Sequence, residues 1–542
     1  MRGMRRTAIV LLLLVEALGC KPADPKDPGT WLGQLADADG KKRVAAVQQL
    51  RKLKARQAAP PIAALLKDQQ VKEEAALALR DLGGPAEVPA LIEGVDTTVG
   101  AGSDQATRVA NRTNARIAEA LGEIGDARAG PALLRLSRSQ DGLVRLSAVQ
   151  ALGAIRCKDA VPELSHIVDD EASPPLLIKK AIVALGQIAD PGGIPALLHG
   201  LLLERQGVSF LPESSYALFQ IGAPAVEPAL QIAQDQDAAF LAWARENNRA
   251  PAGTYAKAAL VLGDLGDPRA TPVLLAKLKY TDPDPNPGTA KLLTNLVRGF
   301  AANALGRLRV QEAAAPILAL VQTRDPQDEG LAGFAAEALV WIGDRSQARE
   351  LSKRAQAGAV RSRLIAAHAA AMLGEGPLAK ELTALAAREE KGAPAGCLKA
   401  VGELQLPLEK EKEACALLAA QFAELARPLE AAGRCAGTAA CWLDLLGDKE
   451  PLIRERAAFE LGRESYGDAV PALSRACSDP DLRVRAAAIR ALEWLLPLPG
   501  ARALLKSAAA PLLAQLTAEQ GKLEVSKVNE ELRRLQARLA RL

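Results

Sequence analysis

The chain has 542 residues, of which 49% are hydrophobic and only 3% aromatic, and its formal net charge is +4. A charge so close to neutral gives no global signature of nucleic-acid binding. Three histidines are too few for a metal centre built from several histidine pairs. Alanine and leucine dominate the sequence, as they do in all-helical proteins.

The N-terminal segment predicts export. Three arginines within the first six residues precede an apolar run at 8–15, which is too short to span a bilayer and is typical of a secretory signal. After Glu16, the residues ALGC at 17–20 resemble the lipobox of bacterial lipoproteins. Two features depart from that pattern, because Ala17 and Leu18 stand in swapped order and Glu16 lies beside the apolar run. An ordinary secretory signal followed by a coincidental cysteine is the alternative.

The lipobox resemblance implies that residues 1–19 are a removed signal peptide and that Cys20 carries the lipid, including its acyl (palmitate-type) chain. Lys21 stands where inner-membrane lipoproteins carry an aspartate, so the resemblance favours the outer membrane, with the chain facing the periplasm. Residues 20–38 are rich in proline, which predicts a stiff, extended tether.

A repeat follows the tether. Its most regular feature is an apolar residue in an Ala-Leu-Gly-like step, here called the anchor, and most anchors recur after 28–34 residues. A period of this length indicates a solenoid of helix pairs. The anchors are Leu50, Leu79, Leu121, Leu152, Leu185, Leu218, Leu262, Leu305, Leu339, Leu373, Val401, Ala432, Leu461 and Leu492.

Each repeat carries the same helix-boundary signals. A glycine four residues after the anchor is expected to end the first helix in the left-handed conformation, at Gly83, Gly125, Gly222, Gly266 and Gly343. An aspartate then follows in three copies as a cap: Asp126, Asp267 and Asp344. A proline ten residues after the anchor marks the first turn of the second helix, at Pro60, Pro89, Pro131, Pro162, Pro195, Pro228, Pro272 and Pro471.

These units resemble HEAT repeats, in particular the short form of phycobilisome-lyase-type proteins. The resemblance implies an all-α fold, a right-handed α-solenoid of about 14 helix pairs over residues 39–516. It also implies a structural ladder of first-helix basic residues that bond to turn aspartates of neighbouring repeats. Six basic residues stand seven before an anchor: Arg43, Lys72, Arg145, Arg298, Arg454 and Arg485. We further expect the second helices to line the concave face.

Sequence motifs for catalysis are missing. No His-Glu-x-x-His or Gly-x-Ser-x-Gly motif occurs. His166 precedes three acidic residues that are expected to belong to a turn, and His199 and His368 stand alone in helices. The run DPDPNPG at 282–288 lacks the glycine and glutamate of a calcium loop. We therefore expect no catalytic residue, no metal and no cofactor.

Six cysteines remain after Cys20, in a compartment that permits disulfides. Two pairs are placed symmetrically about a predicted inter-helix turn and could each staple a helix hairpin: Cys397 with Cys415, and Cys435 with Cys441. Burial as small core residues is the alternative. Cys157 and Cys477 have no evident partner.

Three anchor spacings are long, at 42, 44 and 43 residues, and their insertions lie near 94–106, 235–251 and 281–290. Insertions at one junction share one edge of a solenoid and often line a binding face. The middle insertion carries Phe240, Trp243 and Arg245, which are candidate partner contacts. A helix extension packed on the core is the alternative.

Both ends of the predicted solenoid carry a further signal. Lys41 to Arg56 is strongly basic and fits either a solvated first repeat or contact with anionic headgroups. Residues 517–542 carry an apolar 4-3 pattern at Val528, Leu532, Leu535, Leu539 and Leu542. That pattern favours a capping helix over a dimer seam, so a monomer is expected.

Together these features predict a non-enzymatic, lipid-anchored scaffold of the bacterial cell envelope that binds a protein partner and no nucleic acid. One alternative is an enzyme or enzyme accessory of the phycobilisome-lyase-like class. A HEAT-like nucleic-acid-binding protein is a second alternative, which export and near-neutral charge disfavour.

Overall fold

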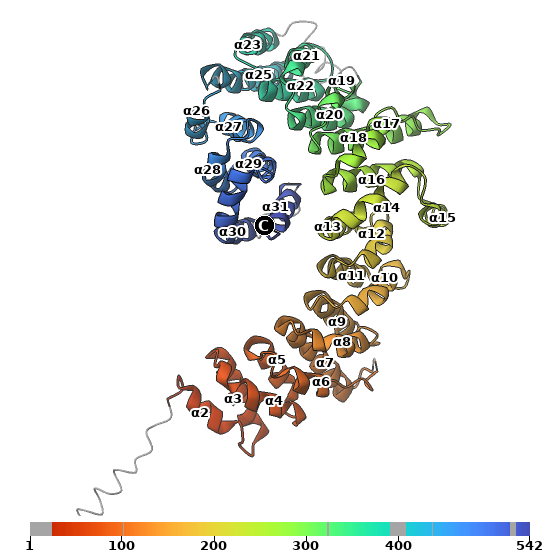
Figure 1. The fold of residues 1–542 in the computed structure, drawn as a ribbon, viewed down its shortest axis with the longest axis vertical. Helices are drawn as coiled ribbons and strands as arrows, with labels where there is room; N and C mark the ends of the chain where they lie inside the picture. The colour runs from red at the N-terminus through yellow and green to blue at the C-terminus, as the bar shows by residue number, and fades with distance from the viewer. Residues whose placement is uncertain are drawn as a thin grey trace, which may run out of the picture. The chain divides into compact units, whose positions relative to one another are not determined.

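A computed structural model describes residues 24–100, 102–321, 325–390, 408–435, 437–520 and 527–541 (Figure 1). The chain divides into two compact units, residues 1–197 and 198–542, which are described separately. The regular secondary structure of the described residues is helical apart from one antiparallel hairpin of two short strands, β1 (Glu204–Arg205) and β2 (Val208–Ser209). The predicted all-α solenoid is therefore confirmed, while the signal peptide and Cys20 lie outside the described residues.

Unit 1 is a stack of helix pairs preceded by the short helix α2 (Pro28–Gln34). The first helices carry the anchors, and neighbouring first helices pack side by side. They are α3 (Gly40–Lys52), α5 (Lys72–Leu82), α7 (Gln105–Ile124), α9 (Gly142–Ala154) and α11 (Pro175–Ile188). The second helices are α4 (Ala59–Ala64), α6 (Val88–Glu93), α8 (Gly130–Leu136), α10 (Val161–Asp169) and α12 (Ile194–Gly200), which runs into unit 2.

The prediction of an extended tether over residues 20–38 is wrong for Pro28–Gln34, which form helix α2. Asp27 caps this helix by accepting a hydrogen bond from the Gly29 amide, and Pro28 occupies its first turn, where the missing N–H costs nothing. Helix α2 packs on α3, and the Trp31 indole donates to the Pro25 carbonyl at 2.9 Å. The solenoid thus begins before residue 39, and no extended spacer continues beyond Asp27.

The turns follow the predicted boundary signals, with an added 3₁₀ turn. Asp126, Asp267 and Asp344 each accept a backbone N–H at the start of such a turn. Gly125, Gly266 and Gly343 end their helices in the left-handed conformation as predicted, whereas Gly222 combines φ 82° with ψ −133° and does not. The prediction is also wrong for Gly83, which is extended with φ −72° and ψ 165°. Its N–H still bonds to the Leu79 carbonyl, so the helix ends there without a left-handed residue.

The glycine directly after the anchor has a packing role that the boundary signals do not predict. A Cβ atom built on Gly263 would lie 2.8 Å from the Ala304 Cα of the next first helix. Gly122, Gly153, Gly306 and Gly462 meet an alanine of the next first helix in the same way. The Ala-Leu-Gly step therefore marks the point where consecutive first helices approach most closely, because no side chain separates them there.

Unit 2 continues the helix pairs with longer connections. Its first helices are α13 (Leu211–Ile221), α16 (Pro251–Leu265), α18 (Pro287–Arg307), α20 (Glu329–Ile342), α22 (Val360–Leu373), α25 (Leu408–Cys435), α27 (Pro451–Arg463) and α29 (Leu482–Leu495). The second helices are α14 (Val226–Ala233), α17 (Thr271–Lys277), α19 (Ala314–Leu318), α21 (Ala348–Arg354), α23 (Pro377–Glu390), α26 (Ala439–Leu445), α28 (Val470–Ala476) and α30 (Pro499–Gln520). Helix α15 (Ala238–Glu246) lies in the second insertion. The anchor Val401 lies outside the described residues.

Helix α25 packs along α23, and α27 bonds directly to the end of α22. The Arg456 guanidinium, fully buried, donates to the carbonyls of Ala371 at 2.5 Å and Gly374 at 2.9 Å. It also pairs with buried Glu460 at 2.6 Å. This buried pair satisfies the carbonyls at the C-terminal end of α22 and holds first helices together that are about 80 residues apart in sequence.

Helix α31 (Lys527–Leu539) links the last helices of unit 2, α29 and α30, to its first helices, α13 and α16, and this link is here called the closure of unit 2. Its apolar face, Leu532, Leu535 and Leu539, is buried in the same core as residues of α29 and α30. Its other side contacts α13. The Tyr216 hydroxyl of α13 donates to the Arg533 carbonyl of α31, and Arg534 of α31 donates to Asp264 of α16 (Figure 1). The capping helix expected at 517–542 therefore begins later than predicted, since residues 517–520 belong to α30.

The predicted bond between a first-helix basic residue and a turn aspartate is present at Arg43 and Arg454, two of the six ladder positions. Arg43 bonds to the Asp37 carbonyl and to the Asp68 carboxylate, and Arg454 repeats both contacts with Asp448 and Asp479. Arg298 and Arg485 also donate to the carbonyls of the preceding loops. Each such arginine ties its own loop to its helix, so the ladder fixes how one repeat stacks on the next.

Candidate functional site

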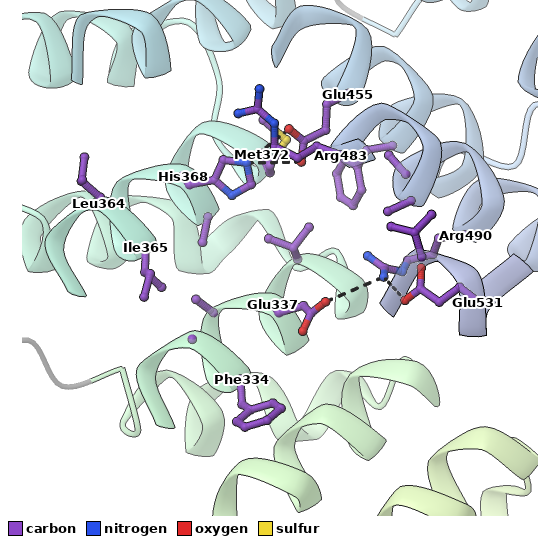
Figure 2. Close-up of a pocket in the computed structure, with 18 of the residues that line it drawn as sticks. Phe334, Glu337, Leu364, Ile365, His368, Met372, Glu455, Arg483, Arg490 and Glu531 are labelled. Atoms are coloured by element: carbon purple, nitrogen blue, oxygen red, sulfur yellow. Dashed lines mark hydrogen bonds and ion pairs between the residues drawn. The ribbon is translucent and has the colours of Figure 1, made fainter. Parts of the chain in front are cut away.

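A cavity of about 700 Å³ lies inside unit 2. Residues from α20, α22, α27, α29 and α31 line it (Figure 2). Four of these elements are first helices, so the expectation that second helices line the inner face is wrong for this unit. The reason is that consecutive first helices pack on one another through the glycine contacts. The sides of these helices that are not used in this packing face the pocket, which α31 completes.

Two register positions of the repeat point into this pocket. Residues nine before the anchor line it at Gly330, Leu364 and Arg483, and residues two before the anchor line it at Glu337, Phe459 and Arg490. The two positions are seven residues apart, which is two helical turns, so they share one face of each first helix. This surface is here called the first-helix face.

The pocket wall is mainly apolar. Phe334, Ile365 and Leu364 are only partly covered by protein and reach the cavity, as Figure 2 shows. Met372, Phe459 and Trp494 complete the apolar wall, and the Phe459 and Trp494 rings meet edge to face with centroids 5.8 Å apart. Such a lining suits a ligand or side chain that gains from leaving water.

The charged groups of the pocket are paired within the protein. His368 lies 3.2 Å from the Glu455 carboxylate, and Arg490 lies 3.1 Å from Glu531 and stacks over the Trp341 ring at 3.9 Å. Burial favours the neutral imidazole, but the adjacent Glu455 carboxylate outweighs burial and raises the pKa of His368 above its usual value of 6.5. The expectation that His368 stands alone is therefore wrong, because it is ion-paired.

In unit 1 the first-helix face carries exposed apolar side chains. Leu143 of α9 and Leu176 of α11 both stand nine before their anchors and are 50% and 55% exposed. Val183 stands two before its anchor on α11 and is 38% exposed. Because α9 and α11 pack side by side, Leu143, Leu176 and Val183 form one surface, here called the unit 1 apolar patch.

The three predicted partner contacts of the second insertion differ in how far they are exposed. Phe240 is buried at 5% exposure, and Trp243 stacks on His199 with ring centroids 3.9 Å apart. Arg245 alone of the three is exposed. Helix α15 packs both aromatic rings beside His199 of α12, which buries Phe240 fully and Trp243 in part. The partner role of Trp243 and Arg245 stays a prediction.

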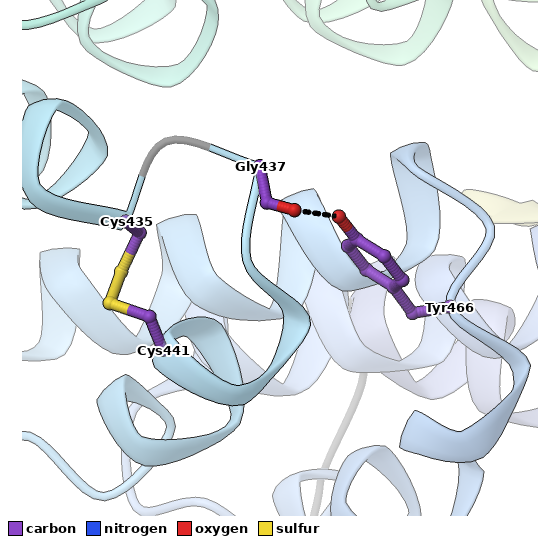
Figure 3. The surroundings of a disulfide bond; sticks show 4 residues. All are labelled: Cys435, Gly437, Cys441 and Tyr466. Carbon is purple, nitrogen blue, oxygen red and sulfur yellow. Dashed lines mark hydrogen bonds between the residues drawn. A yellow bond between two sulfur atoms is a disulfide. The ribbon is translucent and has the colours of Figure 1, made fainter.

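A disulfide joins Cys435, the last residue of α25, to Cys441 in the first turn of α26 (Figure 3). The Tyr466 hydroxyl donates to the Gly437 carbonyl at 2.8 Å and fixes the loop between the two cysteines. Cys415 is also disulfide-bonded, while its predicted partner Cys397 lies outside the described residues. Cys157 and Cys477 are free, and burial raises the pKa of the Cys477 thiol to about 12.

Among the described residues no group of His, Cys, Asp and Glu side chains could hold a metal ion. Near His166, Asp170 accepts the Ala172 amide and the Ser173 hydroxyl in the turn after α10, as the turn interpretation expected. Within the described ranges no helix is both long enough and apolar enough to cross a bilayer.

The pocket was not predicted from the sequence, although a signal was present. Aligning the repeats on their anchors shows leucines at position −9 in five first helices and aromatic or charged residues at position −2 in several. Apolar side chains on a helix face that the helix's own repeat does not cover indicate a binding surface. What the alignment could not show is that α31 closes this face into a cavity.

Two family models match the sequence. The model described as HEAT repeats matches residues 30–108, 134–209 and 440–523, and the model described as PBS lyase HEAT-like repeat matches residues 115–139, 255–280 and 297–323. A search of curated protein sequences finds no significant match.

Solved structures similar to this chain include two importins. Importin β in an ammonium sulfate condition is 12% identical over 93% of this chain and 70% of its own, with a TM-score of 0.45. Yeast importin β (Kap95p) is 13% identical over 94% and 76%, with a TM-score of 0.41. The CpcE–CpcF complex of phycocyanin lyase from Nostoc sp. PCC7120 is 17% identical over 54% and 95%, with a TM-score of 0.23. From its repeats, helix pairs and family matches, the chain is a HEAT-repeat protein.

Proposed function

We propose that this HEAT-repeat protein is a lipid-anchored scaffold of the bacterial cell envelope that binds a protein partner through its first-helix face. The anchor is Cys20, acylated after removal of residues 1–19, and the chain faces the periplasm from the outer membrane. HEAT-repeat solenoids generally bind proteins along extended surfaces built from successive repeats. The proposed activity is binding, without a catalytic step.

The observation that carries the partner proposal is the unit 1 apolar patch. Leu143, Leu176 and Val183 occupy equivalent positions in neighbouring repeats and leave apolar surface in water. Their exposure costs free energy that a partner would recover on binding. Lys179, one turn after Leu176 on α11, and Gln150 on α9 are exposed beside them, which gives the patch the mixed apolar and polar character of a protein interface.

The partner experiment replaces exposed leucines with glutamate, in the unit 1 apolar patch and, as a control, at a similarly exposed position of unit 2. The double variant Leu143→Glu with Leu176→Glu should fold, because both side chains are at least half exposed. We expect it to lose a partner that the wild-type chain retains after in-cell crosslinking and capture. Leu417→Glu, at a comparably exposed leucine of α25 in unit 2, is the control and should retain that partner. Equal capture by all three proteins would refute the assignment of the patch.

The anchor is tested separately. Cys20→Ala should move the protein from the membrane fraction to the soluble fraction, and mass spectrometry of the mature wild-type N-terminus should find an acylated cysteine at position 20. A Cys20→Ala protein that still sediments with membranes, or a wild-type N-terminus without lipid, would contradict the anchor and leave the patch experiment unaffected.

A further inference from the structure

We propose that the pocket of unit 2 binds an uncharged ligand whose buried part is hydrocarbon, such as a neutral aromatic molecule or an alkyl chain. This inference concerns a second site and goes beyond the proposed function, because it depends neither on the lipid at Cys20 nor on the unit 1 apolar patch. It rests on the size of the pocket, on its lining and on the pairing of its charges.

The size suits a small molecule. A cavity of about 700 Å³ lies within the range of pockets that enclose drug-sized ligands. Its wall comes from five helices that are far apart in sequence, between Gly330 of α20 and Glu531 of α31. A ligand inside would therefore be surrounded on several sides, rather than lying on one helix face.

The lining selects hydrocarbon. Phe334, Leu364, Ile365 and Val340 each keep part of their surface free, and an apolar ligand would cover that surface and remove it from water. Trp494 offers a ring face or edge for an aromatic ligand. The apolar wall therefore favours a hydrocarbon group over a polar one.

The ion pairs of His368 and Arg490 disfavour a charged ligand in the pocket. His368 is engaged by Glu455 at 3.2 Å, Arg490 by Glu531 at 3.1 Å and Arg361 by Glu329 at 2.8 Å. Arg483 pairs with Asp481 at 2.8 Å. A ligand anion that bound His368 or Arg490 would have to displace Glu455 or Glu531, which line the pocket, and leave that carboxylate unpaired beside the apolar wall, which is unfavourable. A neutral ligand leaves every pair in place.

Helix α31 completes the site. Val528 and Glu531 belong to the pocket wall, so the pocket has its described form only while unit 2 is closed. Buried leucines hold α31 to α29 and α30. The part of the pocket wall that α31 contributes is therefore fixed in place when unit 2 is folded.

Two fluorescent probes that differ by one sulfonate group make a direct test. N-phenyl-1-naphthylamine is neutral and 8-anilino-1-naphthalenesulfonate is its anionic relative. Titration of the purified full-length chain should give saturable binding of about one neutral probe per chain and quenching of tryptophan emission, because Trp494 lies in the wall. The anionic probe should bind at least about tenfold more weakly.

A filling variant locates the site. Gly333 lines the pocket inside α20, and a Cβ built there meets only Ile365 Cδ1 at 3.9 Å, so Gly333→Leu adds a side chain to the cavity at a helical position where leucine is favoured over glycine. It should weaken the neutral probe at least tenfold. Gly253→Leu in α16, where a Cβ meets nothing within 4 Å and which does not line the pocket, is the matched control and should bind as the wild type does.

Some results would overturn the proposal. These are the absence of saturable binding of the neutral probe to the wild type, equal binding by Gly333→Leu and wild type, and tighter binding of the anionic probe. Gly330→Leu, at the rim of the same pocket with no atom within 4 Å of its Cβ, repeats the filling test if Gly333→Leu does not fold, as judged by its melting transition.

Discussion

Arg534 of α31 donates a hydrogen bond at 2.7 Å to the carboxylate of Asp264 in α16, across 270 residues of sequence. Asp264 is 1% exposed and also lies 3.3 Å from Arg307 of α18. Around this pair, Arg538 donates to the Asp264 carbonyl and Arg541 to the carbonyls of Phe219 and Gln220. The contact that closes unit 2 is thus polar, whereas α31 is held to α29 and α30 by leucines.

Arg534→Ala should loosen this closure without detaching α31. Removal of one partner of a buried ion pair costs about 3–5 kcal/mol, and the remaining Arg307 should reduce the loss in unfolding free energy to about 1–3 kcal/mol. Hydrogen exchange should speed up at the C-terminal ends of α13 and α16, while α29 and α30 keep their protection. Unchanged protection of α13 and α16 would mean that the closure does not form in solution.

A double-mutant cycle with Asp264→Asn measures the coupling itself. If the pair acts as the structure indicates, the two substitutions together should cost less than the sum of their separate effects. Strict additivity would be evidence against a direct contact between the two side chains.

The glycine after the anchor gives a paired prediction within one helix. Gly263→Ala should destabilise unit 2, by about 1–3 kcal/mol as overpacking does, because the new Cβ would lie 2.8 Å from the Ala304 Cα. Gly253→Ala, also in α16 but with open space around its Cβ, should stabilise it by up to about 1 kcal/mol through helix propensity. Chemical denaturation of both variants decides the matter, and equal effects would show that α16 and α18 are not packed backbone to backbone.

The His368–Glu455 pair predicts a pH dependence. The pKa of His368 is raised in the folded chain, because the attraction of Glu455 exceeds the effect of burial. Its contribution to stability is therefore fully present below the unfolded pKa and is lost as pH rises through the higher folded pKa. Unfolding free energies measured from about pH 6 to pH 9 should fall more for wild type than for His368→Gln. Parallel curves for the two proteins would contradict the ion pair.

The cysteines predict a selective thiol pattern. In protein purified without reductant and then unfolded, Cys157 and Cys477 should react with a thiol reagent, whereas Cys415, Cys435 and Cys441 should react only after reduction. The Cys435–Cys441 bond closes a loop with a separation of only 6 residues, so reducing it should cost roughly 2 kcal/mol by the loop-closure relation. Full reactivity of all cysteines without reductant would show that the disulfides do not form.

Local signals made the helix pairs predictable. Prolines, capping aspartates and most turn glycines act within a few residues, so the sequence pattern alone places Pro131, Asp126 and Gly125 correctly. The sequence pattern did not identify Arg363 as a ladder residue, because it stands ten residues before the anchor Leu373 instead of seven. It nevertheless makes the ladder contacts, to the Ala355 carbonyl and to Glu389 at 2.6 Å.

The candidate sites were less predictable, because they depend on which helices meet. Phe240 and Trp243 beside Arg245 look the same in sequence whether they face a partner or α12. The pocket needs Phe334, Phe459 and Glu531 to meet from three distant helices, and no local pattern specifies the closure by α31. For the unit 1 apolar patch, the alignment places Leu143 and Leu176 at one register position. Register does not decide exposure, however, because Leu452 also stands nine before its anchor and is only 9% exposed.

Site-specific photo-crosslinking in the envelope tests the central claim, that the first-helix face of unit 1 binds a protein. A photoreactive phenylalanine at position 176 should yield a discrete crosslinked protein in living cells, and the same residue at position 417 on α25 should not. Adducts of the same mass from both positions, or none from position 176 in a folded and exported chain, would contradict the binding face proposed for this HEAT-repeat protein.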